Sequence, residues 1–277
     1  PFTRGRERSR SITSVVKEAK DIVKKGYKEI TLLGQNVNSY STSEGDFPIL
    51  LDELAKIKKI KRIRYVSPHP RDIDETLLEI MVKHDNICNQ IHLPLQAGSS
   101  RILKRMNRTY TKEEFLNLVD MIKRYIPNCS LSTDIIVGFP GETDEEFNET
   151  LEIVSKVQFN FSFMFKYSAR PGTKAAEYTD QISEGVKQSR LETLIEFQQK
   201  ITLIKNRKKI GLNLDVVIEK ESKKSKQQWA GRTEGNTWVI FDKKNNYKIG
   251  DLVKIKILDA QGITLFGSIH LKKEVLV

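Results

Sequence analysis

The chain has 277 residues, of which 38% are hydrophobic and 30% are charged, and its net charge is +11. This composition is typical of a soluble globular protein with room for one large domain and one small domain. It argues against a membrane protein, because no apolar stretch approaches the roughly 18 residues that a transmembrane helix needs.

Five short apolar runs predict the strands of the larger domain. They begin about 30 residues apart, with helix-like sequence between them, which is the period of strand–helix units. Strands separated by helices pair in parallel through right-handed crossovers. The runs cover residues 30–33, 63–66, 91–93, 135–137 and 161–165.

The helices of this domain have recognisable ends. An apolar stripe that Gly26 terminates predicts a helix before the first strand, and a strand upstream of Pro1 would complete a set of six. The predicted fold class is therefore α/β, with an open or partial barrel. Capping-box spacing predicts three further helix starts, at Asp72 with Glu75, Thr111 with Glu114, and Thr143 with Glu146.

A long helix from about residue 184 to 209 leads to a different pattern. Short alternating runs separated by turns predict a small all-β barrel, similar in style to nucleic-acid-binding OB-type folds. These runs cover residues 214–218, 229–232, 237–241, 252–258 and 262–270. We place the larger domain at residues 1–208, with a linking helix at about 184–208, and the small domain at residues 209–273.

Charge is concentrated at the carboxyl end of the chain. Residues 201–277 hold 16 lysines and arginines against 8 acidic residues, a net charge of +8, which leaves +3 for residues 1–200. A basic module that binds a polyanion and a lysine-rich soluble surface both explain this asymmetry. Trp229 and Trp238 flank the polar turn 231–236, and they are either stacking platforms for RNA bases or core residues.

Polar turns follow the predicted strands, and ligands of parallel α/β folds bind at the carboxyl ends of strands. Amide side chains both donate and accept hydrogen bonds, so they suit a zwitterionic or nucleoside ligand, although they are also ordinary turn residues. His92 lies within a strand and is interpreted as structural. The candidate ligand-binding residues of the turns are Gln35, Asn36, Ser67, Gln96, Gly138, Gly141 and Glu142.

The chain has two cysteines, Cys88 and Cys129. Two thiols cannot form a disulfide framework or a metal site by themselves, and both are interpreted as small buried side chains. Sparse cysteine without a recognisable export signal predicts a cytoplasmic protein.

Taken together, six strings along the chain resemble the radical SAM methylthiotransferases, and within them the branch that acts on isopentenyl-adenosine in tRNA. The strings occur in family order and span most of the chain. They are PFTRG at residues 1–5, LGQNVN at 33–38, HLPLQAGS at 92–99, DIIVGFPGET at 134–143, SARPGT at 168–173 and GRT at 231–233.

The resemblance implies a partial (βα)6 TIM-type barrel without its first strand, followed by a TRAM domain that helps to hold RNA. It implies S-adenosylmethionine as cofactor, two [4Fe–4S] clusters in the full-length enzyme, and an electron donor such as flavodoxin or ferredoxin. The implied reaction adds a methylthio group to C2 of N6-isopentenyl-adenosine beside the anticodon. The residues expected to contact the tRNA anticodon stem-loop are Arg4, Arg170, Arg232, Lys243 and Lys244.

One departure from the family is important. The family's C-x3-C-x2-C loop and its amino-terminal cluster domain would lie upstream of Pro1, so this chain is expected to supply no cluster ligand. Two alternatives stay open. One is a non-catalytic RNA-binding protein on a barrel scaffold, and the other is a sister methylthiotransferase that acts on threonylcarbamoyl-adenosine or a ribosomal protein.

Overall fold

The fold is described from a computed structural model, which covers residues 8–243 and 247–270. Five parallel strands form the larger domain, in the two sheets β1–β4 and β5–β6–β7. A parallel bridge between Ile63 and Ile87 connects the sheets. The strands are β1 (Glu29–Leu32), β4 (Arg62–Tyr65), β5 (Gln90–His92), β6 (Ser130–Val137) and β7 (Phe161–Lys166).

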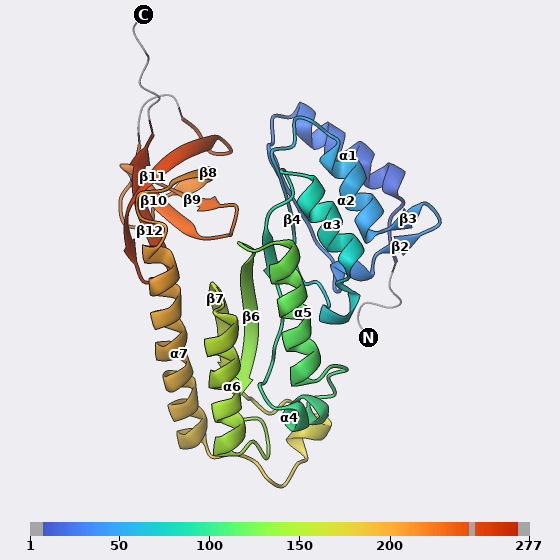
Figure 1. The fold of residues 1–277 in the computed structure, drawn as a ribbon, viewed down its shortest axis with the longest axis vertical. Coiled ribbons are helices and arrows are strands. Elements are labelled where there is room, and N and C mark those ends of the chain that lie inside the picture. Colours follow the sequence, from blue (N-terminus) through green and yellow to red (C-terminus); the bar gives the residue numbers. More distant parts are fainter. Residues whose placement is uncertain (1–7, 244–246, 271–277) are drawn as a thin grey trace, which may run out of the picture.

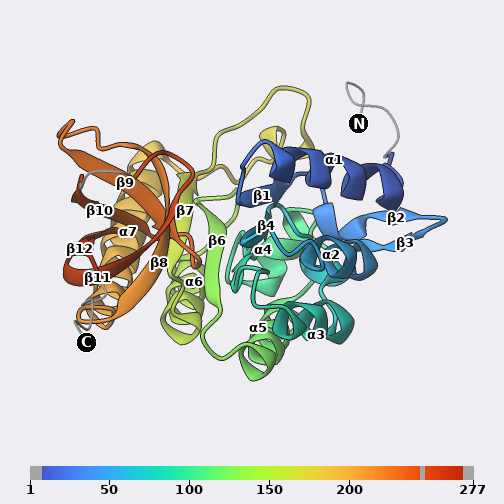
Figure 2. The same ribbon diagram turned by 90° about the horizontal axis from the view of Figure 1, so that it is seen from above.

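Helices cover the outer side of this curved sheet, and its inner face points toward the open side of a partial barrel (Figures 1 and 2). Apolar residues of the strands and helices form one continuous core between these layers. The helices are α1 (Ile12–Lys24), α2 (Phe47–Ala55), α3 (Glu75–Lys83), α4 (Ser100–Arg105), α5 (Lys112–Tyr125), α6 (Asp144–Val157) and α7 (Glu184–Arg207). Short elements complete the domain, namely the hairpin β2 (Ser41–Thr42) and β3 (Gly45–Asp46) and the 3-10 turns η1 (Val37–Ser39), η2 (Pro70–Asp72) and η3 (Lys174–Ala176).

The small domain is a closed barrel with the strand order β10–β12–β11–β8–β9. Alternate residues of each strand point inward and form a separate apolar core. Both parts of the predicted fold class are thus confirmed, the α/β barrel segment and the all-β barrel after it. The strands are β8 (Asn213–Glu221), β9 (Gln228–Thr233), β10 (Trp238–Asp242), β11 (Leu252–Gln261) and β12 (Thr264–Ile269). The predicted domain boundary at residue 208 lies between the end of α7 and the start of β8, and the predicted end at residue 273 lies outside the described residues.

Two local predictions need correction. Strand β6 begins at Ser130 rather than near Ile135, because its first half alternates polar and apolar residues instead of forming an apolar run. The helix start predicted at Asp72 is also wrong, since Asp74 caps α3 and accepts a hydrogen bond from the backbone N–H of Leu77 at 2.9 Å. Asp72 instead ends η2. The capping boxes predicted at residues 111–114 and 143–146 are both confirmed.

The small barrel is attached to the amino-terminal ends of the strands of the larger domain, opposite α4 (Figure 1). Arg62 and Arg64 of β4 are buried at this junction. Arg62 donates to the carbonyl oxygens of Arg232 at 2.8 Å and Asp215 at 2.6 Å. These bonds fix the orientation of the small barrel against the inner face of the sheet. No helix among the described residues is long and apolar enough to cross a membrane.

Candidate functional site

The turns after β1, β4 and β5 converge on one pocket at the carboxyl ends of the strands. We call it the mouth pocket, and its volume is about 140 Å³. It contains four of the residues predicted from the sequence. Its walls are formed by Gln35, Asn36, Ser67, Pro68, His69, Pro70, His92, Pro94, Gln96, Arg108, Tyr110 and Asp134.

Two of the predicted residues have an uncommon backbone conformation. Ser67 has φ 57° and Gln96 has φ 68°, both in the left-handed region. Residues other than Gly, Asn and Asp adopt this region at a cost, and such residues concentrate at functional sites. Hydrogen bonds to β6 hold Gln96, whose N–H donates to the Asp134 carbonyl and whose carbonyl accepts from Ile136, each at 2.8 Å.

The three amides of the first turn have different roles. Asn38 is buried, and its side chain donates to the His69 carbonyl at 2.9 Å and accepts from the His69 N–H at 2.7 Å. It therefore joins the first two turns. Gln35 and Asn36 have exposed side chains that no hydrogen bond engages among the described residues. Their amides are available to a ligand.

Gln96 also lines the mouth pocket. Only 6% of this residue is accessible, and its side chain forms no hydrogen bond within the described part of the chain. Its amide is therefore available to a polar ligand in the pocket.

Eight wall residues were not among the site residues predicted from the sequence, and four of them, His92, Arg108, Tyr110 and Asp134, have polar side chains that come from outside the turn 67–70. His92 was interpreted as structural, but its Nδ1 lies 3.0 Å from the Ser132 hydroxyl and its Nε2 lies 3.3 Å from Asp134 Oδ2. The alternation of β5 and β6 could have revealed this, because one face of each strand is polar. Arg108 and Tyr110 follow α4 in a loop, and nothing in the sequence spacing distinguished them.

The protonation of two wall residues is influenced by burial. Burial lowers the pKa of His69, and its Nδ1 accepts a hydrogen bond from the Arg71 N–H at 3.2 Å. Burial raises the pKa of Tyr110 to about 12, and its hydroxyl donates to the Pro94 carbonyl at 2.8 Å. At neutral pH both side chains are therefore uncharged. Arg108 contributes a guanidinium to the wall.

The turn 138–142 does not line the mouth pocket. Its carboxylate, Glu142, is buried and accepts from the Gly138 N–H at 2.6 Å and from Arg190 at 2.7 Å. Burial raises the pKa of Glu142, and these two donors oppose that effect. A Cβ on Gly138 would lie 2.4 Å from the Lys187 side chain. The turn is thus packed against α7, and its contact with a cofactor stays a prediction.

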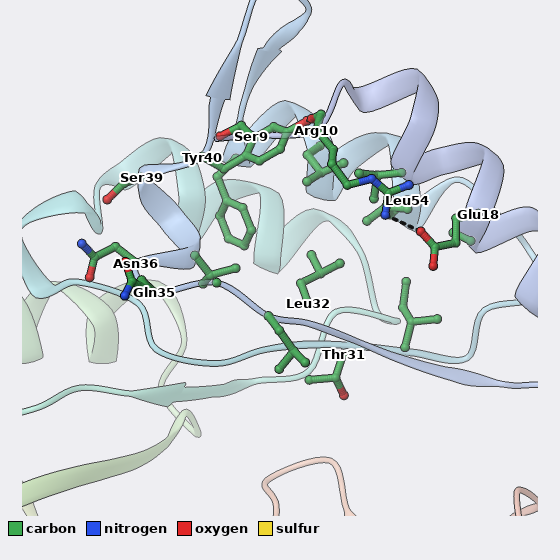
Figure 3. Close-up of a pocket in the computed structure, with 18 of the residues that line it drawn as sticks. Ser9, Arg10, Glu18, Thr31, Leu32, Gln35, Asn36, Ser39, Tyr40 and Leu54 are labelled. Carbon is green, nitrogen blue, oxygen red and sulfur yellow. Dashed lines mark hydrogen bonds and ion pairs between the residues drawn. The ribbon is translucent and has the colours of Figure 1, made fainter. Parts of the chain in front are cut away.

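A larger pocket lies beside β1, and we call it the edge pocket (Figure 3). Its volume is about 840 Å³ and its walls are largely apolar side chains of α1, β1 and α2. Eight consecutive residues, 30–37, line it, so the pocket follows the edge of β1 and the turn after it rather than one face of the strand. Gln35 and Asn36 belong to both pockets.

The residues predicted to contact RNA lie in different parts of the two domains. Arg170 is exposed in the loop after β7. Arg232 forms an ion pair with Glu219 and lies 5.3 Å from the centre of the Trp238 ring. Lys243 lies 4.2 Å from the centre of the Trp229 ring. Arg4 and Lys244 lie outside the described residues.

The two tryptophans are both half-buried, so neither interpretation from the sequence describes them fully. Trp229 packs against the core of the small barrel and also carries Lys243 over its ring. The ring of Trp238 lies beneath two cations, Lys220 at 4.5 Å and Arg232. Both rings thus form cation–π contacts on the surface of the small barrel.

The two cysteines are buried. Burial raises the pKa of Cys88 to about 11 and that of Cys129 to about 12, which disfavours the thiolate that metal binding requires. Among residues 8–243 and 247–270, no three His, Cys, Asp or Glu side chains are grouped so that they could hold a metal ion.

Comparison with known proteins gives relatives of high similarity. The chain is 49% identical over 272 residues to the tRNA-2-methylthio-N(6)-dimethylallyladenosine synthase of Parabacteroides distasonis, covering 96% of this chain and 59% of that protein. It is 48% identical over 273 residues to the synthase of the same name from Fusobacterium nucleatum, covering 97% and 62%. The chain thus spans about three fifths of the length of these curated relatives.

A solved structure supports the fold of the larger domain. Coproporphyrinogen III oxidase from Escherichia coli, described as a radical SAM enzyme, superposes with a TM-score of 0.52 at 15% identity, covering 80% of this chain and 59% of that one. Residues 1–154 match the radical SAM superfamily, and residues 207–270 match the TRAM domain. The resemblance inferred from the sequence motifs is confirmed, and the chain belongs to the radical SAM superfamily and carries a TRAM domain at its carboxyl end.

Proposed function

We propose that this chain is the larger part of a tRNA methylthiotransferase, which adds a methylthio group to C2 of N6-isopentenyl-adenosine beside the anticodon. The relatives that share 45% or more of its residues carry the name of that synthase. The observation that carries the proposal is the mouth pocket, where Gln35, Asn36, Ser67 and Gln96 meet. The low cysteine content supports a cytoplasmic location for the protein.

The chemistry of the mouth pocket fits S-adenosylmethionine. The methionine part of this cofactor carries an ammonium and a carboxylate, and the wall offers amide oxygens, Asp134 and the guanidinium of Arg108. The unpartnered amide of Gln96 would bind a polar group of the cofactor. When bound beside a reduced cluster, the cofactor supplies a 5′-deoxyadenosyl radical. This chain would bind and orient it.

The cluster ligands are expected in the part of the protein upstream of Pro1. The edge pocket supports this expectation, because it exposes the edge of β1 together with apolar side chains of α1 and α2. A strand paired with that edge would complete the six strands predicted for the barrel. An electron donor such as flavodoxin or ferredoxin would reduce the clusters.

Reconstitution tests the proposal. The protein extended upstream through the expected cysteine loop should bind [4Fe–4S] clusters, cleave S-adenosylmethionine and methylthiolate an isopentenylated anticodon stem-loop. The 277-residue chain alone should bind no stoichiometric cluster. Cluster binding by the short chain would contradict this assignment of the cysteines.

The alternatives give different results in the same assay. Methylthiolation of a threonylcarbamoyl-adenosine stem-loop or of a ribosomal protein would identify a sister enzyme. RNA binding without cofactor cleavage by the extended protein would favour a non-catalytic RNA-binding protein.

A further inference from the structure

A third pocket lies at the junction of the two domains, and we call it the junction pocket. Its volume is about 250 Å³. The inner face of β5–β7 forms one wall, α7 contributes a second, and the small barrel contributes a third. The residues that line it are Gln90, Ser130, Ser132, Asn160, Phe161, Phe163, Thr202, Asn206, Arg232, Gly235, Asn236, Thr237, Trp238 and Ile263.

One buried polar residue of the junction pocket, Gln90, has an unengaged side chain. Gln90 is 7% exposed, and none of the described residues forms a hydrogen bond with its side-chain amide. Its neighbours on the inner face are occupied, since Ser130 donates to the Gly235 carbonyl at 2.8 Å and Ser132 contacts His92. An amide that lines the pocket without a protein partner suits a ligand that both donates and accepts hydrogen bonds.

Aromatic rings form a second part of the pocket. Phe163 is 48% exposed, although it lies on the inner face of the sheet in the larger domain. It contacts Phe161 edge-to-face, with ring centres 4.8 Å apart. Trp238 adds an indole from the small barrel. Half-exposed rings around an amide can stack on a flat heteroaromatic ring, and each stacked base contributes substantially to RNA binding.

Positive charge surrounds the same pocket. Lys209 donates to Asn206 at 3.3 Å and to Thr237 at 3.0 Å, and Lys205 donates to Asn160 at 2.8 Å. All three partners line the pocket. Neither lysine has a carboxylate within ion-pair distance in the described part of the chain, so the charge is uncompensated. Burial lowers the pKa of both lysines to about 8, and an anion beside them would restore it.

We propose that the junction pocket binds one unpaired nucleotide of the RNA substrate, with its base on Phe163 and Trp238, its edge at Gln90, and its phosphate near Arg232 and the two lysines. The inference rests on the proposed function. A hydrophobic peptide would leave the amide of Gln90 and the charges of Lys205 and Lys209 without partners, whereas a nucleotide offers a partner to the amide, the rings and the lysines. Ser132 of this pocket contacts His92 of the mouth pocket, so the bound nucleotide lies along the same inner face as the cofactor site.

Affinity for an anticodon stem-loop tests the inference, using the whole chain and two matched pairs of variants. Phe163→Leu removes a ring inside the pocket, and Phe165→Leu removes a similarly exposed ring from the same strand that does not line it. Gln90→Met removes the buried amide, with Gln188→Met on the exposed face of α7 as control. We expect Phe163→Leu and Gln90→Met to weaken binding roughly five- to thirty-fold, and the controls to leave it unchanged.

A set of stem-loops with single abasic nucleotides identifies the bound base. One abasic position in the loop should weaken binding to the unaltered chain and abolish the effect of Phe163→Leu, because the stacked partner is already absent. If the stem-loop binds and Phe163→Leu behaves as Phe165→Leu, the junction pocket is not the nucleotide site, while the proposed function stands. If the chain does not bind the stem-loop at all, the RNA role in the proposed function fails together with this inference.

Discussion

The guanidinium of Arg64 donates to the carbonyl oxygen of Thr233 at 2.6 Å, although 169 positions separate the two residues in the sequence. The same guanidinium donates to the Glu234 carbonyl at 2.6 Å and to Glu29 Oε1 at 3.0 Å. One buried side chain thus joins the strand β1, the strand β4 and a turn of the TRAM domain.

We predict that Arg64→Ala separates the two domains. The substitution leaves two carbonyl groups and the Glu29 carboxylate without their main donor, so it should cost about 3 kcal/mol or more of unfolding free energy. Denaturant unfolding measures this cost, and limited proteolysis between α7 and β8 measures the release of the small barrel. Arg71→Ala, an exposed arginine, is the control. Equal stability of the two variants would show that the junction does not depend on Arg64.

We predict that Ser67→Gly lowers cofactor affinity without destabilising the protein. Glycine accepts the left-handed conformation of this exposed residue, so unfolding free energy should stay equal or rise by up to about 1 kcal/mol. Loss of the hydroxyl should weaken S-adenosylmethionine binding by the extended protein about two- to ten-fold. Ser67→Ala should lose the same affinity without the gain in stability. Unchanged affinity in both variants would remove Ser67 from the cofactor site.

Two variants should distinguish the exposed amides of the first turn, Gln35 and Asn36, from its buried amide, Asn38. Replacing Gln35 and Asn36 together by Ala should raise the dissociation constant of S-adenosylmethionine and leave the melting temperature nearly unchanged, because both side chains are exposed. Asn38→Ala should cost about 1–3 kcal/mol of unfolding free energy, because it leaves the backbone groups of His69 unpaired. Destabilisation by the double variant at unchanged affinity would assign a purely structural role to Gln35 and Asn36.

Lys209 should make stability depend on alkaline pH. Burial lowers its pKa from 10.5 to about 8. Below pH 8 Lys209 is therefore charged in both states, and burial of this charge destabilises the folded state relative to the unfolded state. This penalty is fully present below pH 8 and is relieved as the pH rises toward 10.5. The stability of Lys209→Met relative to the unaltered chain should therefore decrease by a few kcal/mol between pH 7 and 10. A difference that does not vary with pH would show that Lys209 titrates normally.

The sequence by itself determined the order and kind of the elements. Strand spacing predicted the five parallel strands, and the Thr111 and Thr143 capping boxes predicted two helix starts, because these signals depend on residues that are close in the chain. The motifs also predicted Gln35, Asn36, Ser67 and Gln96 as site residues, and all four line the mouth pocket, since turns at strand ends meet at one rim in a parallel sheet.

Only the tertiary structure showed which polar residues line a pocket and which are engaged by other parts of the fold. Asn38 and Glu142 both stand in polar turns after strands, and His69 and Arg190 engage them from distant segments. His92 looks structural, but the alternation of β5 places it in the mouth pocket. The sequence singled out Trp238 and Arg232 but not the junction pocket itself, because Gln90 and Trp238 meet only when the two domains dock. Hydrogen-bond partners are a property of the folded arrangement, and a local pattern carries no record of them.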